Sequence, residues 1–472
     1  MTFSISNDMT NVSLGNVAQI LFSKGFTSQM NRTYADFDNV LMNMKEGSPT
    51  TERTYQYLLL TALGINSHKW QQQGAGNIAF PTGDAVTTQE VTAYMKQLQT
   101  TIELDAIVWD RIKKADKKYV GNPFEVELQA KIDVIKKAQA RALHGDGSGV
   151  LGKVASVSVV SNKLVVVLDT ADATVGGGNT NWFHRGEKVA MCTTAGATQR
   201  ADGSGTKDVV YFSVASADRK AHSITLTGYT SADAVISVTA VNEIGAGDLI
   251  YPVNVLNASF EGPNVSTIAG TDFGVITPVM AGLESLTAAD NRKVFGVSMT
   301  GELGGTQYDC GGSLFSVEHI EEGFNEVEQN VGAGKYKWNQ LLMPYNAYSA
   351  LLEGKEADRR FNSVEDSVRG GRKFIYQYGD NALDCRKSFY CAFNRIYGIP
   401  SPASGEMGES GFALEFRGTP FESISVNGQK EFLKPNSSGQ YTNVLQSFLQ
   451  SYATMIAKQP AAVARLSNFL MA

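Results

Sequence analysis

The chain has 472 residues, of which 43% are hydrophobic and 19% charged, and its formal net charge is −6. This length suits two or three domains, or one domain with large insertions. The mild negative charge argues against a nucleic-acid grip built on clustered Lys and Arg. No apolar run reaches the roughly 18 residues of a membrane span, and the N-terminus lacks signal-peptide features, so we expect no membrane association.

Residues 1–64 have a helical pattern, best developed over 33–44 and 51–63. Residues 66–112 differ, because a polar, glycine-rich stretch leads into the alternating apolar residues Ile102, Leu104, Ala106 and Val108. We interpret 66–112 as a two-stranded arm with a loose tip. An isolated hairpin is marginal in water, so such an arm needs a neighbour to lie on.

Apolar side chains stand out on this polar arm. They are Trp70, Ile78, Phe80 and Tyr94. Exposed aromatic residues on an otherwise polar segment indicate a contact surface, so these four residues are the candidate subunit interface. The alternative is that they pack back on their own domain.

A long amphipathic helix is predicted over 123–143. Asn122 is a good N-cap, Pro123 suits the first helical position, and the Asp133–Lys137 spacing pairs charges on a solvated face. Residues Phe124, Leu128, Ile132, Ile135 and Ala142 form its apolar stripe. The pattern Gly145-x-Gly147-x-Gly149 follows the helix, so we interpret it as a helix stop and tight turn rather than a phosphate loop. His144 would then carry a partial positive charge favoured by the helix dipole.

Residues 151–255 form a block of short β segments without helical periodicity. The strands are expected at 154–160, 164–168, 188–192, 209–214, 223–226 and 234–241, with a hairpin turn at Ser161-Asn162 and a final segment 245–251 that closes the block. This pattern predicts a small β-barrel or sandwich inserted into the main domain.

Residues 256–400 return to mixed α/β structure. Val317, Ile320, Phe324 and Val327 mark a helix, 338–343 a strand, and 344–354 a second helix. Residues 400–440 are rich in loop signals, and 441–456 are apolar and could be strand or helix.

No pattern of catalytic or metal-binding residues emerges, so we predict no catalytic residue, no cofactor, no metal site and no enzyme. The five histidines form no His-x-x-x-His pattern, and no Gly-x-Ser-x-Gly elbow is present. Glu321-Glu322 is interpreted as a solvated helix face. The cysteines are Cys192, Cys310, Cys385 and Cys391. Without a Cys-x-x-Cys pair they indicate small buried hydrophobic residues in a reducing cytosol rather than a zinc site or disulfides.

Taken in order, these segments resemble the major capsid proteins of tailed bacteriophages, which have the Hong Kong ninety-seven type of fold. The turn 143–149 resembles that family's glycine-rich exit from the spine helix, Gly282-Leu-Glu-Ser-Leu286 the entry to the axial domain, and 338–352 its strand, proline, helix unit. Residues 446–462 are similar to the returning C-terminal strand with its proline-bearing turn.

The resemblance implies an α+β fold with six parts. They are an N-terminal arm (1–65), an extended loop (66–112), the peripheral domain with its spine helix (113–150, helix 123–143), an inserted β domain (151–255), the axial domain (256–400), and a return to the peripheral domain and C-terminus (401–472).

The resemblance also implies a structural protein of the virion capsid. Copies would self-assemble in the host bacterial cytoplasm into pentamers and hexamers of an icosahedral shell around double-stranded DNA, without sequence-specific binding. Because the chain before the arm is short, we expect a separate scaffolding protein or none, together with portal and decoration proteins as partners. Lys69 and Lys96 lie in or near the extended loop, but nothing in the sequence marks them as cross-linking residues.

Two alternatives stay open. An encapsulin-like nanocompartment shell would share the fold and enclose cargo enzymes, although the large β insertion disfavours it. A host-binding or carbohydrate-binding protein would use the β module at 151–255 and would need ligand-facing aromatics there, for which Trp182, Phe183 and Tyr211 are the candidates.

Overall fold

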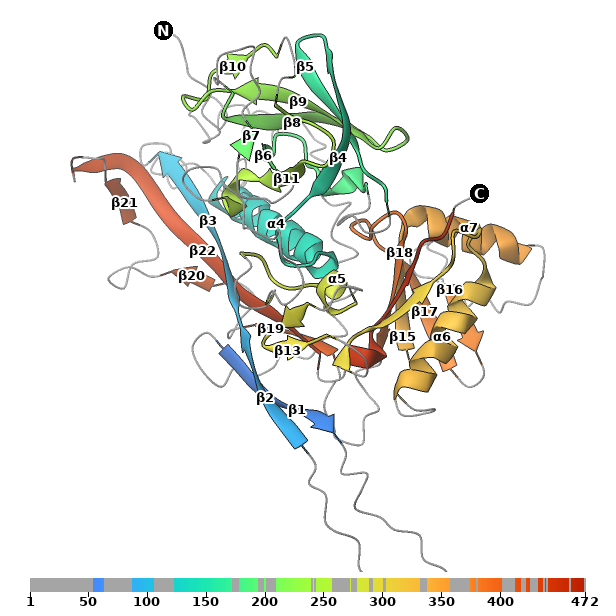
Figure 1. The fold of residues 1–472 in the computed structure, drawn as a ribbon. Coiled ribbons are helices and arrows are strands. Elements are labelled where there is room, and N and C mark those ends of the chain that lie inside the picture. Colours follow the sequence, from blue (N-terminus) through green and yellow to red (C-terminus); the bar gives the residue numbers. More distant parts are fainter. Residues whose placement is uncertain are drawn as a thin grey trace, which may run out of the picture.

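The protein is described here from a computed structural model. The structure describes residues 54–62, 87–105, 123–171, 178–193, 199–200, 209–238, 241, 243–256, 272, 278–287, 292–299, 303–331, 338–356, 374–378, 381–400, 412–416, 422–424, 432–435, 438, 440–457 and 460–470. Strands outnumber helices, and three bodies meet: a β-barrel, a long sheet with a helix along it, and a six-stranded sheet carrying two helices (Figure 1).

The first described element is a two-stranded antiparallel hairpin. Strand β1 (Thr54–Ala62) pairs with β2 (Thr87–Tyr94), from Thr54 opposite Tyr94 to Ala62 opposite Thr87. The helix predicted over 51–63 is therefore wrong. Its leucine run fits a helix or a strand equally well, and pairing with β2 decides for the strand. The helix expected at 33–44 lies outside the described residues.

Strand β3 (Lys96–Asp105) confirms the alternating pattern around Ile102, but its partner is not the one expected. It pairs along its length with β22 (Tyr441–Ala457), in a register that sets Ile102 opposite Ser447. The interpretation of 66–112 as one two-stranded arm is thus wrong, because β2 and β3 belong to different sheets. Positions 106 and 108 of the predicted strand lie outside the described residues.

The 17-residue strand β22 is the longest strand of the chain's described part, and it resolves the ambiguous segment 441–456 as strand. Its other edge binds three short antiparallel strands: β19 (Phe412–Phe416), β20 (Glu422–Ile424) and β21 (Phe432–Pro435). At about 3.3 Å per residue it spans roughly 55 Å. Together, β3 and β22 form a long ribbon that crosses the molecule (Figure 1).

Helix α4 (Pro123–His144) confirms the helix predicted over 123–143 and packs on β3 and β22. Ile135 and Ala142 of the predicted stripe are buried, and Ile132 is half-buried. Asp133, which was expected on a solvated face, is buried as well, because α4 is covered on more than one side. The helix ends at Gly145, and the following turn uses positive φ angles of 90° at Gly147 and 80° at Gly149. The helix stop and tight turn are confirmed.

Residues 152–252 form an antiparallel β-barrel. Its six strands are β4 (Gly152–Val160), β5 (Lys163–Leu168), β6 (Lys188–Cys192), β8 (Tyr211–Asp218), β9 (Ser223–Tyr229) and β11 (Leu249–Pro252). They pair in the ring β9-β5-β4-β11-β6-β8 and back to β9. Closure leaves no open edge in the ring, so the sheet folds around its own interior.

Local sequence explains the barrel well. Every second residue of β9 is buried, and Leu164, Val166, Ile224 and Leu226 fill the interior. Ser161 and Asn162 have φ angles of 51° and 59°, as the predicted hairpin turn between β4 and β5 requires. The strand expected over 234–241 is shorter than predicted, since only β10 (Val235–Ile236) pairs; β7 (Gln199–Arg200) is similarly short.

The third body is a mixed sheet with the order β14-β23-β18-β15-β17-β16. These strands are β14 (Thr306–Asp309), β15 (Trp338–Met343), β16 (Phe374–Tyr378), β17 (Asn381–Lys387), β18 (Arg395–Pro400) and β23 (Ala464–Ser467). Helices α6 (Val317–Val331) and α7 (Tyr345–Glu356) pack on it over a shared apolar core that includes Ile320, Phe324 and Leu351. The predicted helix, strand and helix of this region are confirmed.

Two short connections join the bodies. Helix α5 (Leu283–Leu286) lies against the end of α4, and the hairpin β12 (Lys293–Val294) and β13 (Val297–Ser298) follows it. Barrel residues such as Leu168 belong to the same apolar cluster as Leu143 of α4, Leu283 of α5 and Met455 of β22. The barrel therefore shares a core with the body.

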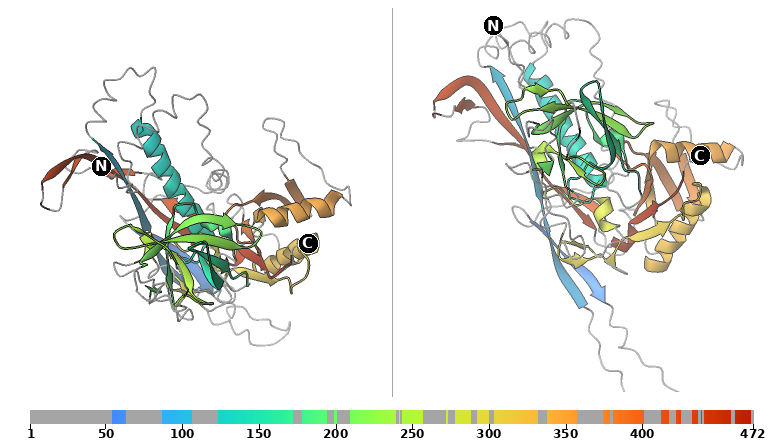
Figure 2. Two further views of the ribbon diagram at one scale, coloured as in Figure 1. Left: turned by 90° about the horizontal axis from the view of Figure 1, so that it is seen from above. Right: turned by 45° about the horizontal axis from the view of Figure 1, so that its top comes forward.

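The six-stranded sheet lies beside the barrel in each view, and α4 runs toward the region where the two meet (Figures 1 and 2). The thiols of Cys192, Cys310, Cys385 and Cys391 are buried, which confirms their interpretation as small core residues. Among the helices of the described residues, none is long and apolar enough to span a membrane.

Candidate assembly interface

The β1–β2 hairpin forms a two-stranded sheet of its own. Its inner end is anchored, because Val91, Ala93 and Met95 are buried against the body. Its outer end projects beyond the long sheet (Figure 1). Within the described residues, no third strand pairs with either edge of this hairpin. Unpaired backbone N–H and C=O groups on both edges make it a template for a strand or surface from another molecule.

The four residues predicted to form the subunit interface are not brought together by the described structure. Tyr94 lies on β2 and is 42% exposed, on the strand face opposite Val91 and Ala93. Trp70, Ile78 and Phe80 lie outside the described residues. Tyr94 is thus the described member of this set, and it faces away from the body as a contact residue would.

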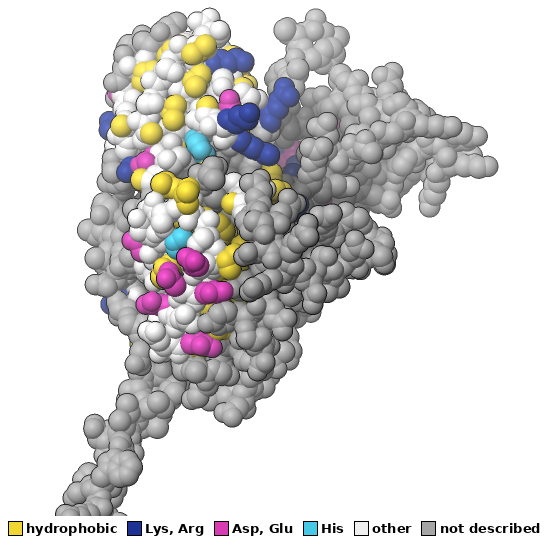
Figure 3. All heavy atoms as spheres, turned by 90° about the vertical axis from the view of Figure 1, so that its right-hand side faces the viewer, with side chains coloured by type: hydrophobic (Ala, Val, Ile, Leu, Met, Phe, Trp, Pro, Cys, Tyr) yellow, Lys and Arg dark blue, Asp and Glu magenta, His cyan; other side chains and the backbone are white. Residues whose placement is uncertain are grey.

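Charge is unevenly distributed over one face of the molecule. Figure 3 shows Lys and Arg side chains gathered over the barrel and acidic side chains gathered lower down, over α6. Glu318, Glu322 and Glu326 of α6 are exposed and spaced four residues apart, while Glu321 is half-buried. The interpretation of Glu321-Glu322 as a solvated helix face is confirmed for Glu322, which bonds the Tyr308 hydroxyl. This acidic face would repel nucleic-acid phosphates.

The barrel is fastened to the six-stranded sheet by a turn that donates hydrogen bonds to a loop backbone. The turn is η3 (Thr180–Trp182) with its N-cap Asn179, and the loop is the β17–β18 loop, residues 388–394. The bonds run from Trp182 Nε1 to the Tyr390 oxygen (2.7 Å), from Asn179 Nδ2 to the Cys391 oxygen (2.7 Å) and from Asn181 Nδ2 to the Phe389 oxygen (3.1 Å). Three successive carbonyls are thereby satisfied by one turn.

Ring contacts add to this interface between the barrel and the β17–β18 loop, which we call the seam. The guanidinium of Arg219 lies 5.3 Å from the Phe389 ring centroid, and the His222 ring lies edge-on to Phe393 at 4.8 Å. A buried polar backbone is costly unless it is bonded, so these contacts hold the loop in one conformation against the barrel. Asn179 and Asn181 are not among the residues predicted from the sequence, where their only signal is the loop-like Gly176-Gly-Gly-Asn stretch.

Burial of the barrel aromatics removes the basis of the ligand-binding alternative. Trp182, Phe183 and Tyr211 are 2%, 5% and 4% exposed. The indole N–H of Trp182, its one polar side-chain group, donates a hydrogen bond to the Tyr390 carbonyl. Tyr211 stacks on Tyr229 and donates its hydroxyl to Asp233, so its ring and its polar group are both engaged within the barrel.

His144 differs from its sequence interpretation. It is buried at the end of α4, with Nε2 2.9 Å from Ser388 Oγ of the β17–β18 loop. Burial lowers the pKa of His144 to about 3. The imidazole is therefore neutral, and the expected favourable charge at the helix terminus is wrong, because burial in the seam outweighs the dipole.

A buried ion cluster lies under this junction. Glu284 of α5 accepts hydrogen bonds from Arg465 Nη1 (2.8 Å) and the Tyr397 hydroxyl (2.6 Å), and Arg395 Nε lies 3.5 Å away. Burial alone would raise the pKa of Glu284, but Arg395 and Arg465 more than offset it, so the pKa is lowered. The cluster gives the motif Gly282-Leu-Glu-Ser-Leu286 a physical role in joining α5 to β18 and β23.

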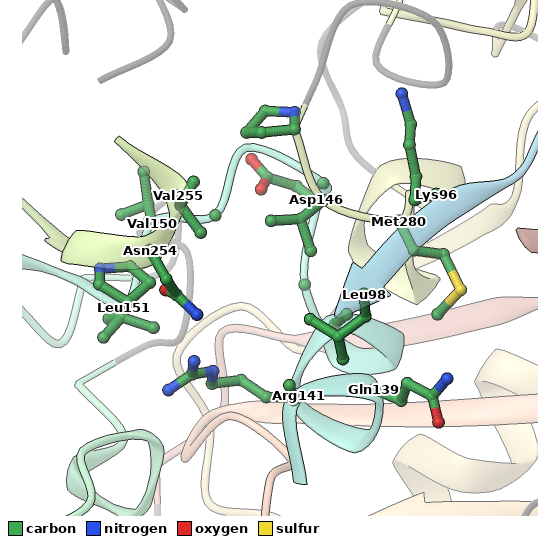
Figure 4. Close-up of a pocket in the computed structure, with 18 of the residues that line it drawn as sticks. Lys96, Leu98, Gln139, Arg141, Asp146, Val150, Leu151, Asn254, Val255 and Met280 are labelled. Carbon is green, nitrogen blue, oxygen red and sulfur yellow. The ribbon is translucent and has the colours of Figure 1, made fainter. Parts of the chain in front are cut away.

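A cavity of about 180 Å³ opens beside the same junction (Figure 4). Leu98, Val150 and Met280 form apolar wall, and Arg141 and Asp146 line the rim. Arg141 Nη1 bonds Glu187 Oε1 at 2.8 Å and the Trp182 oxygen at 2.9 Å. Asp146 accepts from the Ser148 backbone N–H (2.9 Å) and lies 3.7 Å from Arg292. These charged groups are used to hold the junction together.

Among the described residues, no group of His, Cys, Asp and Glu is arranged to hold a metal ion. Three groups with lowered pKa values, His144, His184 and Glu284, are engaged in hydrogen bonds of the seam and the ion cluster.

Comparison with known proteins gives structural matches alone. No family model matches the chain, and no curated protein matches it. Among solved structures, it is similar to the cyanophage A-1(L) capsid asymmetric unit, with 8% identity, a TM-score of 0.46, and coverage of 98% of this chain and 99% of that chain. The likeness is to shell proteins.

Two further solved structures match most of the chain at similarly low sequence identity. The capsid of an empty GTA particle is 10% identical, with a TM-score of 0.41, and the match covers 93% of this chain and 91% of that one. The holo-SrpI encapsulin complex from Synechococcus elongatus is 9% identical, with a TM-score of 0.39 and coverage of 96% and 95%. The solved structures similar to this chain thus include phage capsids and an encapsulin.

Proposed function

We propose that this chain is a self-assembling shell subunit, the major capsid protein of a tailed double-stranded DNA phage. Pentamers and hexamers of it would close into an icosahedral shell around the genome in the bacterial cytoplasm and persist in the virion. Separate scaffolding, portal and decoration proteins are its expected partners. The observation that carries the proposal is the β1–β2 hairpin, which stands off the body with both edges unpaired among the described residues.

Physical reasoning connects the hairpin to assembly. Two strands of nine and eight residues reach about 30 Å, and among their described side chains Val91 and Ala93 are buried. An isolated two-stranded hairpin is marginal in water, so a neighbouring copy that covers it stabilises both molecules. A contact between an arm on one copy and a different surface on the next is heterologous, and such contacts close into rings.

The remaining architecture suits a thin shell. Strand β22 and helix α4 lie along each other and form a stiff frame that crosses the subunit. In this proposal α4 is the spine helix, residues 151–255 are the inserted β domain, and 256–400 are the axial domain. Through the hydrogen bonds of the seam, the inserted domain would hold the axial domain in place relative to β22 and α4.

Imaging of the purified full chain tests the proposal directly. Negative-stain electron microscopy with sedimentation is expected to show closed shells, or rings of five and six subunits. Nucleic acid in particles isolated from the native source supports the phage capsid, whereas enclosed enzymes identify the encapsulin-like alternative. A monomer or dimer at every concentration, with or without co-expressed scaffold, would overturn the shell proposal.

Deletion of residues 72–86 tests whether the connection between β1 and β2 is needed for assembly. This segment lies in the connection between β1 and β2, and its removal leaves both paired strands in place. We expect a folded subunit that assembles poorly. The matched control is deletion of residues 202–205 in the β7–β8 connection of the barrel, which is expected to leave assembly intact. Normal stable shells from the 72–86 deletion would contradict a role for the β1–β2 connection in assembly.

A further inference from the structure

Three histidines from separate elements contact the β17–β18 loop (residues 388–394). His144 ends α4 and lies 2.9 Å from Ser388 Oγ through its Nε2. His184 follows η3, and its Nε2 lies 3.3 Å from the Tyr390 hydroxyl. His222, in the turn between β8 and β9, packs its ring on Phe393. The loop is therefore held by side chains that, once in water, take up a proton in mildly acidic solution.

The surroundings of His144 accept only the neutral imidazole. Its Nδ1 has no hydrogen-bond partner among the described residues, and the side chain is buried. An imidazolium has two N–H donors, so protonation would leave one of them unbonded and bury a charge.

Two carboxylates of this junction, Glu284 and Asp146, are already paired. Glu284 is bound by Arg395, Arg465 and Tyr397, whose ring lies 5.9 Å from the His144 ring. Asp146 lies 3.7 Å from Arg292 and accepts a hydrogen bond from the Ser148 hydroxyl. Neither carboxylate is available to stabilise a charged His144, which agrees with its pKa of about 3.

His184 is held neutral by a similar balance. Burial is the main cause that lowers its pKa to about 4; Glu187 opposes this, while Arg141 and Lys137 add to it. Glu187 is itself taken, since Oε1 bonds Arg141 and Oε2 accepts from the His184 backbone N–H. The β17–β18 loop thus contacts two imidazoles: His144 is buried without a partner for a second N–H, and His184 is half-buried beside a carboxylate that already bonds other groups.

We propose that the barrel and the β17–β18 loop form an acid-sensitive latch, which holds the barrel on the six-stranded sheet in neutral solution and opens when His144 and His184 take up protons. Opening exposes both imidazoles to water, where protonation traps the open form. Between pH 7.5 and 5, each histidine then raises the opening constant about thirtyfold, and the pair about a thousandfold. Carboxylates stay largely ionised in that range. The inference concerns the isolated chain and does not depend on the proposed shell function.

Hydrogen exchange of the full-length protein, read by mass spectrometry at pH 7.5 and 5, tests the latch. Peptides covering 179–184 and 388–395 are compared after correction for the intrinsic pH dependence of exchange. The wild-type opening constant is expected to rise about a thousandfold, that of His144→Gln or His184→Gln about thirtyfold, and that of the double variant hardly at all. The readout is a ratio between two pH values, so it holds even if a variant weakens the seam at both.

Two controls make the outcome decisive. His319→Gln alters a histidine of α6 that bonds Ser313 and Ser316 and not the loop, so it should keep the wild-type response. Peptides from β9 (residues 223–229) should stay protected at pH 5, because the barrel interior is not part of the seam. An unchanged wild-type opening constant, a double variant that keeps the wild-type response, or simultaneous loss of β9 protection would each overturn the latch.

Discussion

The indole Nε1 of Trp182 donates a 2.7 Å hydrogen bond to the carbonyl oxygen of Tyr390, across 208 positions of sequence. Both residues are buried, at 2% and 0% exposure. The bond joins the barrel to the loop that leads into β18, a central strand of the six-stranded sheet. Because water cannot replace the donor at that depth, the bond stabilises the contact between the barrel and the six-stranded sheet.

Trp182→Phe should destabilise the protein by about 1–3 kcal/mol. Phenylalanine keeps most of the apolar contact but leaves the buried Tyr390 carbonyl without its donor. Urea-induced unfolding followed by circular dichroism measures the loss. Val235→Ala, at a barrel position that is 65% exposed, is the control and should stay within about 0.5 kcal/mol of wild type. Equal stability of Trp182→Phe and wild type would mean that the bond contributes nothing to the seam.

Gly282→Ala should cost several kcal/mol or prevent folding. A Cβ at this position would lie 2.2 Å from the Ala142 oxygen and 2.5 Å from the oxygens of Leu143 and Gly145, which are backbone atoms at the end of α4. Thermal unfolding and soluble yield report the effect. Gly245→Ala has nothing within 4 Å of the added Cβ and serves as the control. A fully stable Gly282→Ala protein would show that α5 can move away from α4 at little cost.

Much of the local structure can be predicted from the sequence. The barrel strands alternate every second residue, Ser161-Asn162 marks the hairpin turn, and Pro123 and Gly145 mark the two ends of α4. These signals act within a few residues, so a single sequence contains them in full. The same is true of α6, whose apolar positions repeat with the helical period.

Pairing across long separations could not be predicted in the same way. Strand β3 finds its partner more than 300 residues later, where Ile102 meets Ser447, and no local feature of 96–105 specifies that choice. The 51–63 segment was assigned to a helix because its leucines fit either period, and only β2 decides otherwise. The neutral state of His144 depends on burial by Ser388 and Tyr397, which helix-end reasoning does not include. Tertiary contacts decided each of these points.

Glu284→Gln should destabilise the protein by about 3–5 kcal/mol, because it leaves Arg395 and Arg465 buried without their counter-charge. Chemical denaturation at pH 7 measures the change. Glu318→Gln, on the exposed face of α6, is the matched control and should be close to neutral. A small effect of Glu284→Gln would indicate that the two arginines reach water or another partner.

Stability should fall in two steps as pH decreases. The folded pKa of His144 is about 3, below its unfolded value near 6.5, so its contribution is present above pH 6.5 and is lost progressively between these values. At pH 5 this loss is about 2 kcal/mol for His144. The pKa of Glu284 is also lowered, so its contribution is lost only as pH falls below the unfolded value near 4.3. Free energies of unfolding at pH 7.5, 5 and 4 test the order, and His144→Gln should reduce the first step while sparing the second.

Tyr94→Lys should impair assembly without lowering subunit stability. The side chain is 42% exposed on the outward face of β2, so a charge costs the isolated subunit little. At an interface the same charge would be desolvated without a partner, and the contact would weaken. Sedimentation and electron microscopy measure assembly, and thermal unfolding of the unassembled subunit measures stability. Val235→Lys, at an exposed position of the barrel, is the matched control for an added charge. Shells that form equally well with Tyr94→Lys would remove Tyr94 from the interface, whereas loss with Val235→Lys as well would extend the contact surface to the barrel.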